Sequence, residues 1–262
     1  MRYFLMLLCI FAGLSNCQAG TISPNVSDVK YLDYGKKHEC VVKIQGDYLT
    51  EDKDKHQIFV GSGVLIAPRV VLTAAHVIIN AKNAQVHFNN RKIDVDGFIH
   101  PTKYKLYDFT NLDIAVVFLQ EPIKLDFYPE IYGEQDEVNK ICSISGYGMS
   151  GTHRTGAYRS DGKKRAGSNI VSGMAEGMLV CSITDTPVTS LEFMIANGDS
   201  GGGLFINNKL AGINSCVMTT DGKLDSDYGD ESCHTRLSMH KVWIEEILKK
   251  WEEIVDKKER IE

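Results

Sequence analysis

The feature that most constrains the fold of this chain is a series of short apolar segments, rich in valine and isoleucine, that turn-forming residues separate. Segments of this length and composition are typical of β-strands rather than helices. The first set comprises Cys40–Gln45, Ile58–Ile66, Val70–Thr73, Ala84–Phe88, Lys92–Ile99 and Ile114–Leu119. The second set comprises Ile141–Ser145, Asn169–Gly173, Leu179–Ile183, Gly203–Ile206, Leu210–Ser215 and Thr235–Leu237. We therefore predict an all-β protein with two β-rich halves.

The segments between and after these sets suggest how the chain is divided. An acidic connector that contains proline, Pro122–Glu137, separates a first β-barrel over residues 38–125 from a second over 126–238. In the last part, residues 239–262, apolar residues recur at steps of three and four. This spacing predicts an amphipathic α-helix that packs one face against the body, with partner binding as the alternative. Residues 20–37 are polar and indicate an N-terminal arm or pro-segment.

Three polar stretches are expected at the surface. Thr50–His56 is almost wholly charged and is interpreted as a solvated hairpin tip. Gly146–Gly167 is rich in glycine, serine and threonine and predicts a mobile surface loop, with His153 exposed on it. Asp221–Glu231 is acidic enough to suggest calcium, but it lacks the regular ligand spacing of an EF-hand, so a solvated loop is the favoured interpretation.

Residues 1–19 have the pattern of a secretory signal peptide. Arg2 precedes a short apolar run, and the small residues Cys17 and Ala19 favour cleavage after Ala19. The run is too short to span a bilayer comfortably, so we expect an exported protein, secreted or periplasmic, without a membrane span. The segment before Cys17 also resembles a bacterial lipobox, which makes a lipid anchor on Cys17 the less favoured alternative because Asn16 stands where a small residue is expected.

Export permits disulfide bonds. After cleavage five cysteines would remain, namely Cys40, Cys142, Cys181, Cys216 and Cys233. The odd number leaves at least one thiol free or bonded to another molecule. A bond between Cys216 and Cys233, which flank one loop, is the first expectation and one between Cys181 and Cys233 the second, although spacing alone does not decide. No pair has Cys-x-x-Cys spacing, so a zinc site is not predicted.

The charge distribution excludes one class of function. The net charge is -5, and no basic run is longer than Lys163-Lys164-Arg165. A nucleic-acid-binding domain would show a basic patch or stripe, so we expect no nucleic-acid partner.

A serine enclosed by glycines, within Asn197–Gly203, is the first candidate for chemistry. Glycine permits a positive φ angle and lets another backbone approach closely. The amides of Gly198 and Ser200 can then point to one spot, as in an oxyanion hole. In isolation, such a segment is more often an ordinary β-turn.

Two upstream residues give this serine a mechanism. His76 follows one apolar strand, and Asp113 stands at the head of another. A serine hydroxyl needs a nearby base to act as a nucleophile, and the base needs a partner that fixes its tautomer. His76 and Asp113 fill these roles, and the order His, Asp, Ser is that of chymotrypsin.

With these residues the chain resembles the trypsin/chymotrypsin-like serine endopeptidases, especially their shorter bacterial secreted members, from about Tyr31 to Ile244. The motifs that carry the resemblance are Gly61–Ile66, His100-Pro101, Asp113-Ile114-Ala115, Cys142–Gly148, Gly198–Gly202, Leu210–Ile213 and Val242–Ile244. The resemblance implies two six-stranded antiparallel barrels with a C-terminal α-helix. It also implies hydrolysis of a protein or peptide substrate through an acyl-enzyme, with no cofactor and no metal; we expect a monomer.

The resemblance also implies a role for each catalytic residue. Ser200 attacks the scissile carbonyl, His76 transfers the proton, and Asp113 orients His76. The amides of Gly198 and Ser200 hold the oxyanion.

A specificity pocket is implied as well. Met194 would lie at its base, Val217 and Ser232 on its walls, and Ser215 at the edge of the cleft. Trypsin-like members have an aspartate at the base, so Met194 argues against lysine or arginine before the cleaved bond. Because the branched Val217 should narrow the pocket mouth, we predict a preference for small or medium apolar residues. Two family cysteines are absent, replaced by Val77 and Ala196.

Activation is the point at which the chain departs most from the family pattern. The family pairs a newly freed N-terminal amine with the aspartate that precedes the nucleophile, here Asp199. No Ile-Val-Gly-Gly segment is present, and we hypothesise that cleavage after Lys30 frees Tyr31 to pair with Asp199. The alternative is an enzyme that is active without processing. The rival function is a protease-fold binding protein with little or no turnover, and an esterase is the third choice.

Overall fold

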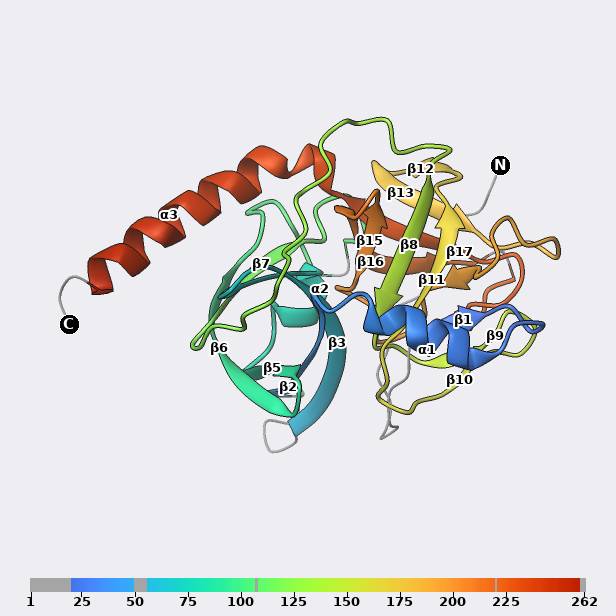
Figure 1. Cartoon of the computed structure of the whole chain (residues 1–262), viewed down its shortest axis with the longest axis horizontal. Coiled ribbons are helices and arrows are strands. Elements are labelled where there is room, and N and C mark those ends of the chain that lie inside the picture. The colour runs from blue at the N-terminus through green and yellow to red at the C-terminus, as the bar shows by residue number, and fades with distance from the viewer. Residues whose placement is uncertain (1–19, 50–55, 107, 220, 260–262) are drawn as a thin grey trace.

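The computed structural model describes residues 20–49, 56–106, 108–219 and 221–259, which form two β-rich halves side by side (Figure 1). A long C-terminal helix runs along the outside of the first half. The expected signal peptide, residues 1–19, and most of the charged segment Thr50–His56 lie outside the described residues.

The first half is a closed barrel of six antiparallel strands in the order β2-β3-β4-β7-β6-β5. The strands are β2 (Val41–Leu49), β3 (His56–Ala67), β4 (Val70–Thr73), β5 (Asn83–Phe88), β6 (Arg91–Ile99) and β7 (Ala115–Leu119). Branched side chains such as Ile44, Leu65 and Leu72 are fully buried inside it. All six strands predicted for this half are confirmed, because their apolar residues fill one continuous core.

The second half is built on a seven-stranded antiparallel sheet in the order β11-β8-β15-β16-β17-β13-β12. The strands are β8 (Ile141–Gly146), β11 (Arg165–Ile170), β12 (Gly173–Ala175), β13 (Met178–Ser182), β15 (Gly203–Ile206), β16 (Lys209–Met218) and β17 (Glu231–Arg236). This sheet has one strand more than the six expected, the short edge strand β12. The strand predicted at Asn169–Gly173 corresponds to β11, which begins earlier, at Arg165. The prediction missed this start because β11 is mostly polar and lacks an apolar pattern.

A small four-stranded sheet, in the order β10-β9-β1-β14, completes the second half. Its strands are β1 (Thr21–Ile22), β9 (Ser150–Thr152), β10 (Gly156–Arg159) and β14 (Phe193–Met194). The prediction of a mobile loop over Gly146–Gly167 is therefore wrong. His153, expected at the surface, is 0% exposed. The local sequence is polar and does not predict strands. Strand β9 forms because it pairs with β1, from the distant N-terminal part of the chain, and with β10.

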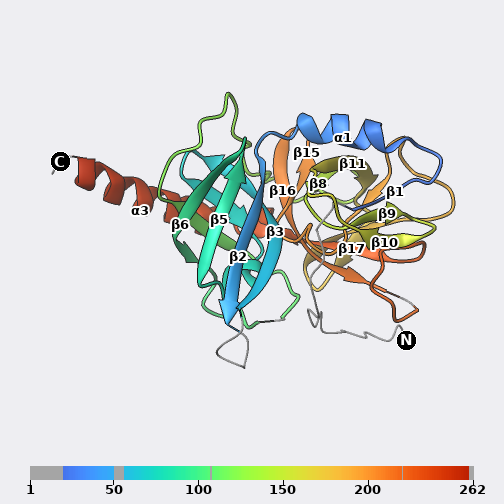
Figure 2. The ribbon, with the colours of Figure 1, turned by 90° about the horizontal axis from the view of Figure 1, so that it is seen from below.

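Residues 20–37 pack onto the second half. Helix α1 (Asp28–Lys36) lies against β11, as Figure 2 shows. The guanidinium of Arg165, which is 1% exposed, forms ion pairs with Asp28 at 2.6 Å and with Asp161 at 3.0 Å. Tyr31 is 0% exposed, and its hydroxyl donates to the carbonyl of Glu192 at 3.1 Å.

The C-terminal helix closes the structure. A short turn η1 (Leu237–Met239) leads into α3 (Lys241–Glu259), which confirms the predicted helix. Its apolar face packs on the first barrel, where the ring of Trp251 stacks on Phe118 with centroids 4.1 Å apart. The core of the first half also includes Phe205 and Ile213 of the second half, so apolar packing continues across the junction between the halves.

The buried hydroxyl of Tyr31 should contribute to stability. It also accepts a hydrogen bond from the Ser23 amide at 3.3 Å, so Tyr31→Phe leaves that buried donor without its partner. We expect a loss of about 1–2 kcal/mol in the free energy of unfolding, measured by urea denaturation. The control is Tyr34→Phe, since no hydrogen bond to the Tyr34 hydroxyl occurs in the described part of the chain. An equal loss in both variants would contradict this assignment.

Candidate active site

His76 and Asp113 meet because two neighbouring strands hold them. His76 lies in the short helix α2 (Ala75–Ile78), directly after β4, and Asp113 lies just before β7. Strands β4 and β7 are paired, with Thr73 opposite Ala115. His76 Nδ1 is 2.7 Å from Asp113 Oδ2, and the His76 amide donates to Asp113 Oδ1 at 3.0 Å. The structure thus brings these two predicted residues together.

The surroundings of Asp113 keep its carboxyl ionised. Asp113 is 0% exposed, and the hydroxyl of Ser215 donates to its Oδ2 at 2.6 Å. Burial acts to raise the pKa of Asp113, but the charge of His76 and hydrogen bonds from His76 and Ser215 hold it below its ordinary value. An ionised carboxylate only accepts hydrogen bonds, so His76 Nδ1 is the donor in the hydrogen bond to Asp113 Oδ2.

Ser200 lies where the two halves meet. The amide of Ser62, in β3, donates to the Ser200 carbonyl at 2.8 Å, and the Ser62 hydroxyl donates to the Gly198 carbonyl at 3.0 Å. The Ser200 hydroxyl donates to the Ser215 carbonyl at 3.3 Å, and within the described residues it makes no hydrogen bond to His76. Ser215 therefore touches both Asp113 and Ser200. The contribution of Ser62 was not predicted, because a serine in a Gly-Ser-Gly strand gives no such signal.

Glycines allow the loop around Ser200 to adopt its conformation. Gly198 has φ +93° and Gly201 has φ +87°, both in the region that favours glycine. A Cβ on Gly201 would lie 2.1 Å from both the carbonyl oxygen of Ser62 and the hydroxyl of Thr73. The amides of Gly198 and Ser200 donate to no backbone carbonyl in the parts of the chain that are described, so both remain free to bind a ligand.

Asp199 is a second buried carboxylate, with different partners. It is 0% exposed and accepts hydrogen bonds from the amides of Gly148 at 2.8 Å, Ala196 at 2.9 Å and Gly20 at 2.8 Å. Burial raises the pKa of Asp199 to about 7, although these hydrogen bonds act in the opposite direction. In the uncleaved chain Tyr31 is buried within α1, and the nitrogen that contacts Asp199 is that of Gly20; pairing of Tyr31 with Asp199 after cleavage stays a prediction.

The residues predicted for the specificity pocket lie on two sheets. Val217 is directly opposite Ser232 in the β16–β17 pair. The Ser232 hydroxyl donates to the Cys181 carbonyl at 3.2 Å, and Ser232 is fully buried. Met194, also fully buried, lies in β14 of the small sheet, where it is opposite Thr21.

The cysteines are thiols in this structure, but four of them lie in pairs. Cys216 is opposite Cys233 in the β16–β17 register, which is the pair expected first. The sulfurs of Cys142 and Cys181 are 3.8 Å apart, a proximity that sequence spacing did not reveal. Disulfide bonding remains a prediction.

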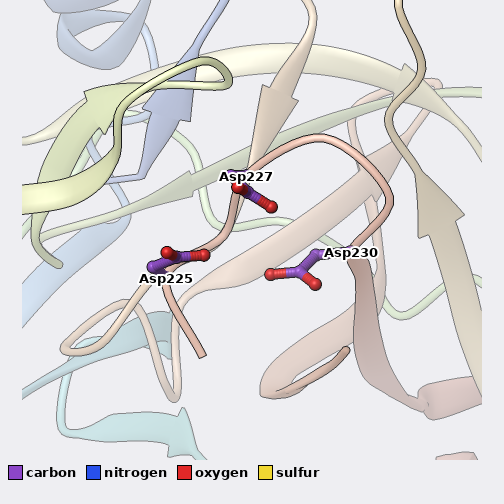
Figure 3. Close-up of side chains that lie close together, drawn as sticks. All are labelled: Asp225, Asp227 and Asp230. Atoms are coloured by element: carbon purple, nitrogen blue, oxygen red, sulfur yellow. The ribbon is translucent and has the colours of Figure 1, made fainter. Parts of the chain in front are cut away.

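Three carboxylates converge in the loop between β16 and β17 (Figure 3). Oxygen atoms of Asp225, Asp227 and Asp230 lie within 4.8 Å of one another. Asp230 is 2% exposed, and burial together with its acidic neighbours raises its pKa to about 6, although hydrogen bonds from Thr219 and Ser226 act in the opposite direction. The loop is thus less solvated than expected, while an acidic cluster alone does not establish a cation site.

Comparison with known proteins gives consistent results. The family model described as Trypsin matches residues 40–244. Phenoloxidase-activating factor 2 of Galleria mellonella is 30% identical over 123 residues, which are 40% of this chain and 40% of that protein. Trypsin eta of Drosophila melanogaster is 26% identical over 207 residues, covering 70% of this chain and 74% of that protein. These relatives are insect proteins, so they do not support a special likeness to bacterial members.

A solved structure of neuropsin, a serine protease expressed in the limbic system of mouse brain, aligns with a TM-score of 0.62 at 19% identity. The alignment covers 80% of this chain and 95% of neuropsin. This similarity confirms the chymotrypsin-like fold predicted from sequence. The described helices include none that is both long and apolar enough to cross a membrane.

The raised pKa of Asp230 predicts a pH-dependent stability. The folded state binds this proton more tightly than the unfolded state, so Asp230 contributes stability below its ordinary pKa of 3.8, and the contribution is lost as pH rises through about 6. Asp230→Asn should flatten the fall in unfolding free energy between about pH 4 and about pH 8.

The control for this measurement is Asp221→Asn. Hydrogen bonds from Lys223 lower the pKa of the exposed Asp221 to about 2, so its titration lies outside this range. A slope that Asp230→Asn leaves unchanged would contradict the prediction.

Proposed function

Because the chain belongs to the trypsin family, we propose that it is an active serine endopeptidase that cleaves peptide bonds through an acyl-enzyme on Ser200. The observation that carries this proposal is the pair of His76 and the buried Asp113, which Ser215 connects to Ser200 at the junction of the two halves. A serine needs an oriented base, and this arrangement supplies one.

The proposed reaction follows from the contacts. Ser200 Oγ attacks the carbonyl carbon while its proton passes to His76 Nε2. The amides of Gly198 and Ser200 stabilise the oxyanion that forms. His76 then protonates the leaving amine, and a water molecule activated by His76 hydrolyses the acyl-enzyme. Asp113 stays ionised throughout and stabilises the imidazolium.

One rearrangement is required before attack. The Ser200 hydroxyl must leave the Ser215 carbonyl and turn to His76. A substrate whose backbone pairs with β16 would compete for this carbonyl and release the hydroxyl. Binding and activation of the nucleophile are then coupled, which is consistent with catalytic hydrogen bonds that form fully only in the substrate complex.

The finer features of the proposal concern specificity and location. Met194, Val217, Ser215 and Ser232 form the pocket, which prefers small or medium apolar residues before the cleaved bond. The protein is exported, functions as a monomer and needs no cofactor or metal. The second candidate is a binding protein with negligible turnover, which is favoured by the donation of the Ser200 hydroxyl to the Ser215 carbonyl.

A fluorophosphonate probe tests whether the nucleophile is assembled. The full chain is produced in a host that exports it, and the purified protein is examined by intact mass. We expect one adduct per chain, none in Ser200→Ala, and labelling of His76→Ala slowed on the order of 1,000-fold. Ser190→Ala, at an exposed serine, should be labelled like the wild type.

Each alternative has a distinct outcome. A folded wild-type protein that the probe does not label would favour the binding protein. Hydrolysis of an ester substrate without hydrolysis of the matching peptide would favour an esterase.

The pocket assignment predicts a change in specificity. Val217→Gly should widen the pocket mouth, and kcat/KM for peptides with phenylalanine before the cleaved bond should rise about 10- to 100-fold relative to alanine peptides. Val188→Gly, at a position that is 50% exposed, is the matched control and should leave this ratio unchanged. An unaltered ratio in Val217→Gly would remove Val217 from the pocket.

A further inference from the structure

Asn214, in β16, is a buried polar residue whose side chain contacts the loop around Ser200. It is 0% exposed. Its amide nitrogen Nδ2 donates to the carbonyl of Ser145 at 3.2 Å and to the carbonyl of Asp199 at 3.2 Å. Only a glycine leaves room for this amide at position 202, since a Cβ built on Gly202 would lie 2.7 Å from Asn214 Nδ2. The Asn214 side chain therefore joins β8 to the loop that carries the nucleophile.

The contact with Asp199 determines the direction of a backbone amide in the site. The Asp199 carbonyl and the Ser200 N–H belong to one planar trans peptide unit, so they point in opposite directions. Two donors hold this carbonyl, namely Asn214 Nδ2 and the Gly202 amide at 2.9 Å. A group that fixes the Asp199 carbonyl also fixes the Ser200 N–H, which is one of the two proposed donors of the oxyanion hole.

The other proposed donor, the Gly198 amide, is oriented by the backbone. The Gly198 N–H shares a peptide unit with the Asn197 carbonyl, which accepts a hydrogen bond from the Met149 amide at 2.6 Å. The Ser200 amide differs because one of the groups that orient it is a side chain. A substitution can therefore remove that group and leave the backbone donors in place.

His234 fixes the orientation of the Asn214 amide. The two residues are directly opposite in the β16–β17 pair, and His234 is also 0% exposed. Asn214 Nδ2 faces two carbonyls, which only accept hydrogen bonds, so the oxygen Oδ1 is the atom that lies 2.9 Å from His234 Nδ1. His234 Nδ1 is therefore the donor in this hydrogen bond.

The second ring nitrogen of His234 also has a partner. His234 Nε2 is 3.0 Å from the hydroxyl oxygen of Ser232. Burial lowers the pKa of His234 to about 3, so the ring is neutral at neutral pH and Nε2 accepts a hydrogen bond. The Ser232 hydroxyl shares its hydrogen between this nitrogen and the Cys181 carbonyl, which is 3.2 Å away. Because both ring nitrogens are bonded, the ring has one orientation, and it imposes one orientation on Asn214.

We propose that Asn214, oriented by His234, is a positioning residue of the oxyanion hole and acts by holding the Asp199–Ser200 peptide unit. The inference rests on the proposed function and deepens it, because the Ser200 amide that is positioned stabilises the oxyanion of the substrate. Asn214 itself does not touch the reacting atoms.

The first experiment replaces Asn214 by leucine, which has a similar volume but no hydrogen-bond donor. The full chain is produced in a host that exports it, and peptide hydrolysis is measured beside fluorophosphonate labelling. Asn214→Leu should lower kcat about 10- to 100-fold and change KM less than about threefold, because the oxyanion forms only after the substrate has bound. The loss stays below the roughly 100- to 1,000-fold that removal of a whole oxyanion donor costs, since Gly202 still holds the carbonyl.

Asn169→Leu is the matched control. Asn169 is a buried asparagine of the second half, and its Nδ2 likewise donates to two carbonyls, those of Ser182 at 3.3 Å and Phe193 at 3.2 Å. This variant should lose a similar free energy of unfolding in urea and keep the kcat of the wild type. An equal loss of kcat in both leucine variants would overturn the inference, because it would reflect a general loss of stability.

Two substitutions of His234 test how the orientation of Asn214 is set. His234→Leu removes the donor to Asn214 Oδ1 and should lower kcat as Asn214→Leu does. His234→Asn places an amide donor near the position of Nδ1, so its kcat should exceed that of His234→Leu at least about threefold. Equal kcat values in the two His234 variants would contradict the role of His234.

A crystal structure of Asn214→Leu beside the wild type measures the peptide unit itself and does not depend on activity. We expect the Asp199–Ser200 unit to be rotated in the variant, so that the Ser200 N–H points in a different direction. If Asn214→Leu does not fold, His234→Leu is crystallised in its place. The two readouts are independent: an unrotated peptide unit would overturn the inference, whereas a folded wild-type protein that the probe does not label would contradict the peptidase.

Discussion

The buried carboxylate of Asp113 is the constraint on which the arrangement of the two halves depends. A charge at a position that is 0% exposed must be fully hydrogen-bonded, and its donors come from both halves: His76 from the first and Ser215 from the second. The Asp113 carbonyl also accepts the Thr235 hydroxyl at 2.8 Å. If the halves shifted apart, this charge would lose its partners, so the same contacts that orient His76 also hold the halves in register.

Asp199 shows how a similar residue acquires the opposite property. Both aspartates are fully buried, yet the pKa of Asp113 is lowered and that of Asp199 is raised. The difference is the donor set: a histidine and a hydroxyl around Asp113, but only neutral backbone amides around Asp199. Hydrogen bonds from neutral amides do not offset the burial of Asp199, so its pKa stays raised.

Much of the fold was predictable because it depends on local patterns. Strands β4 and β7 of the first barrel are almost wholly apolar, and α3 has a helical period, so these elements follow from the sequence. Strands β1, β9 and β14 were missed because each has only two or three residues and is defined by its partners. His153 was misplaced for the same reason, since its polar neighbourhood is buried only when β1 and Glu192 pack around it.

The sequence by itself determined the family resemblance, the β-rich class and the identity of His76, Asp113 and Ser200, because these depend on residue types in a fixed order. Only the tertiary structure decided that Ser215 and Ser62 support the site, that Tyr31 is a core residue and that Gly20 reaches Asp199. The physical reason is separation along the chain. Gly20 and Asp199 are 179 positions apart, and a contact between such distant residues leaves no local sequence pattern from which it could be predicted.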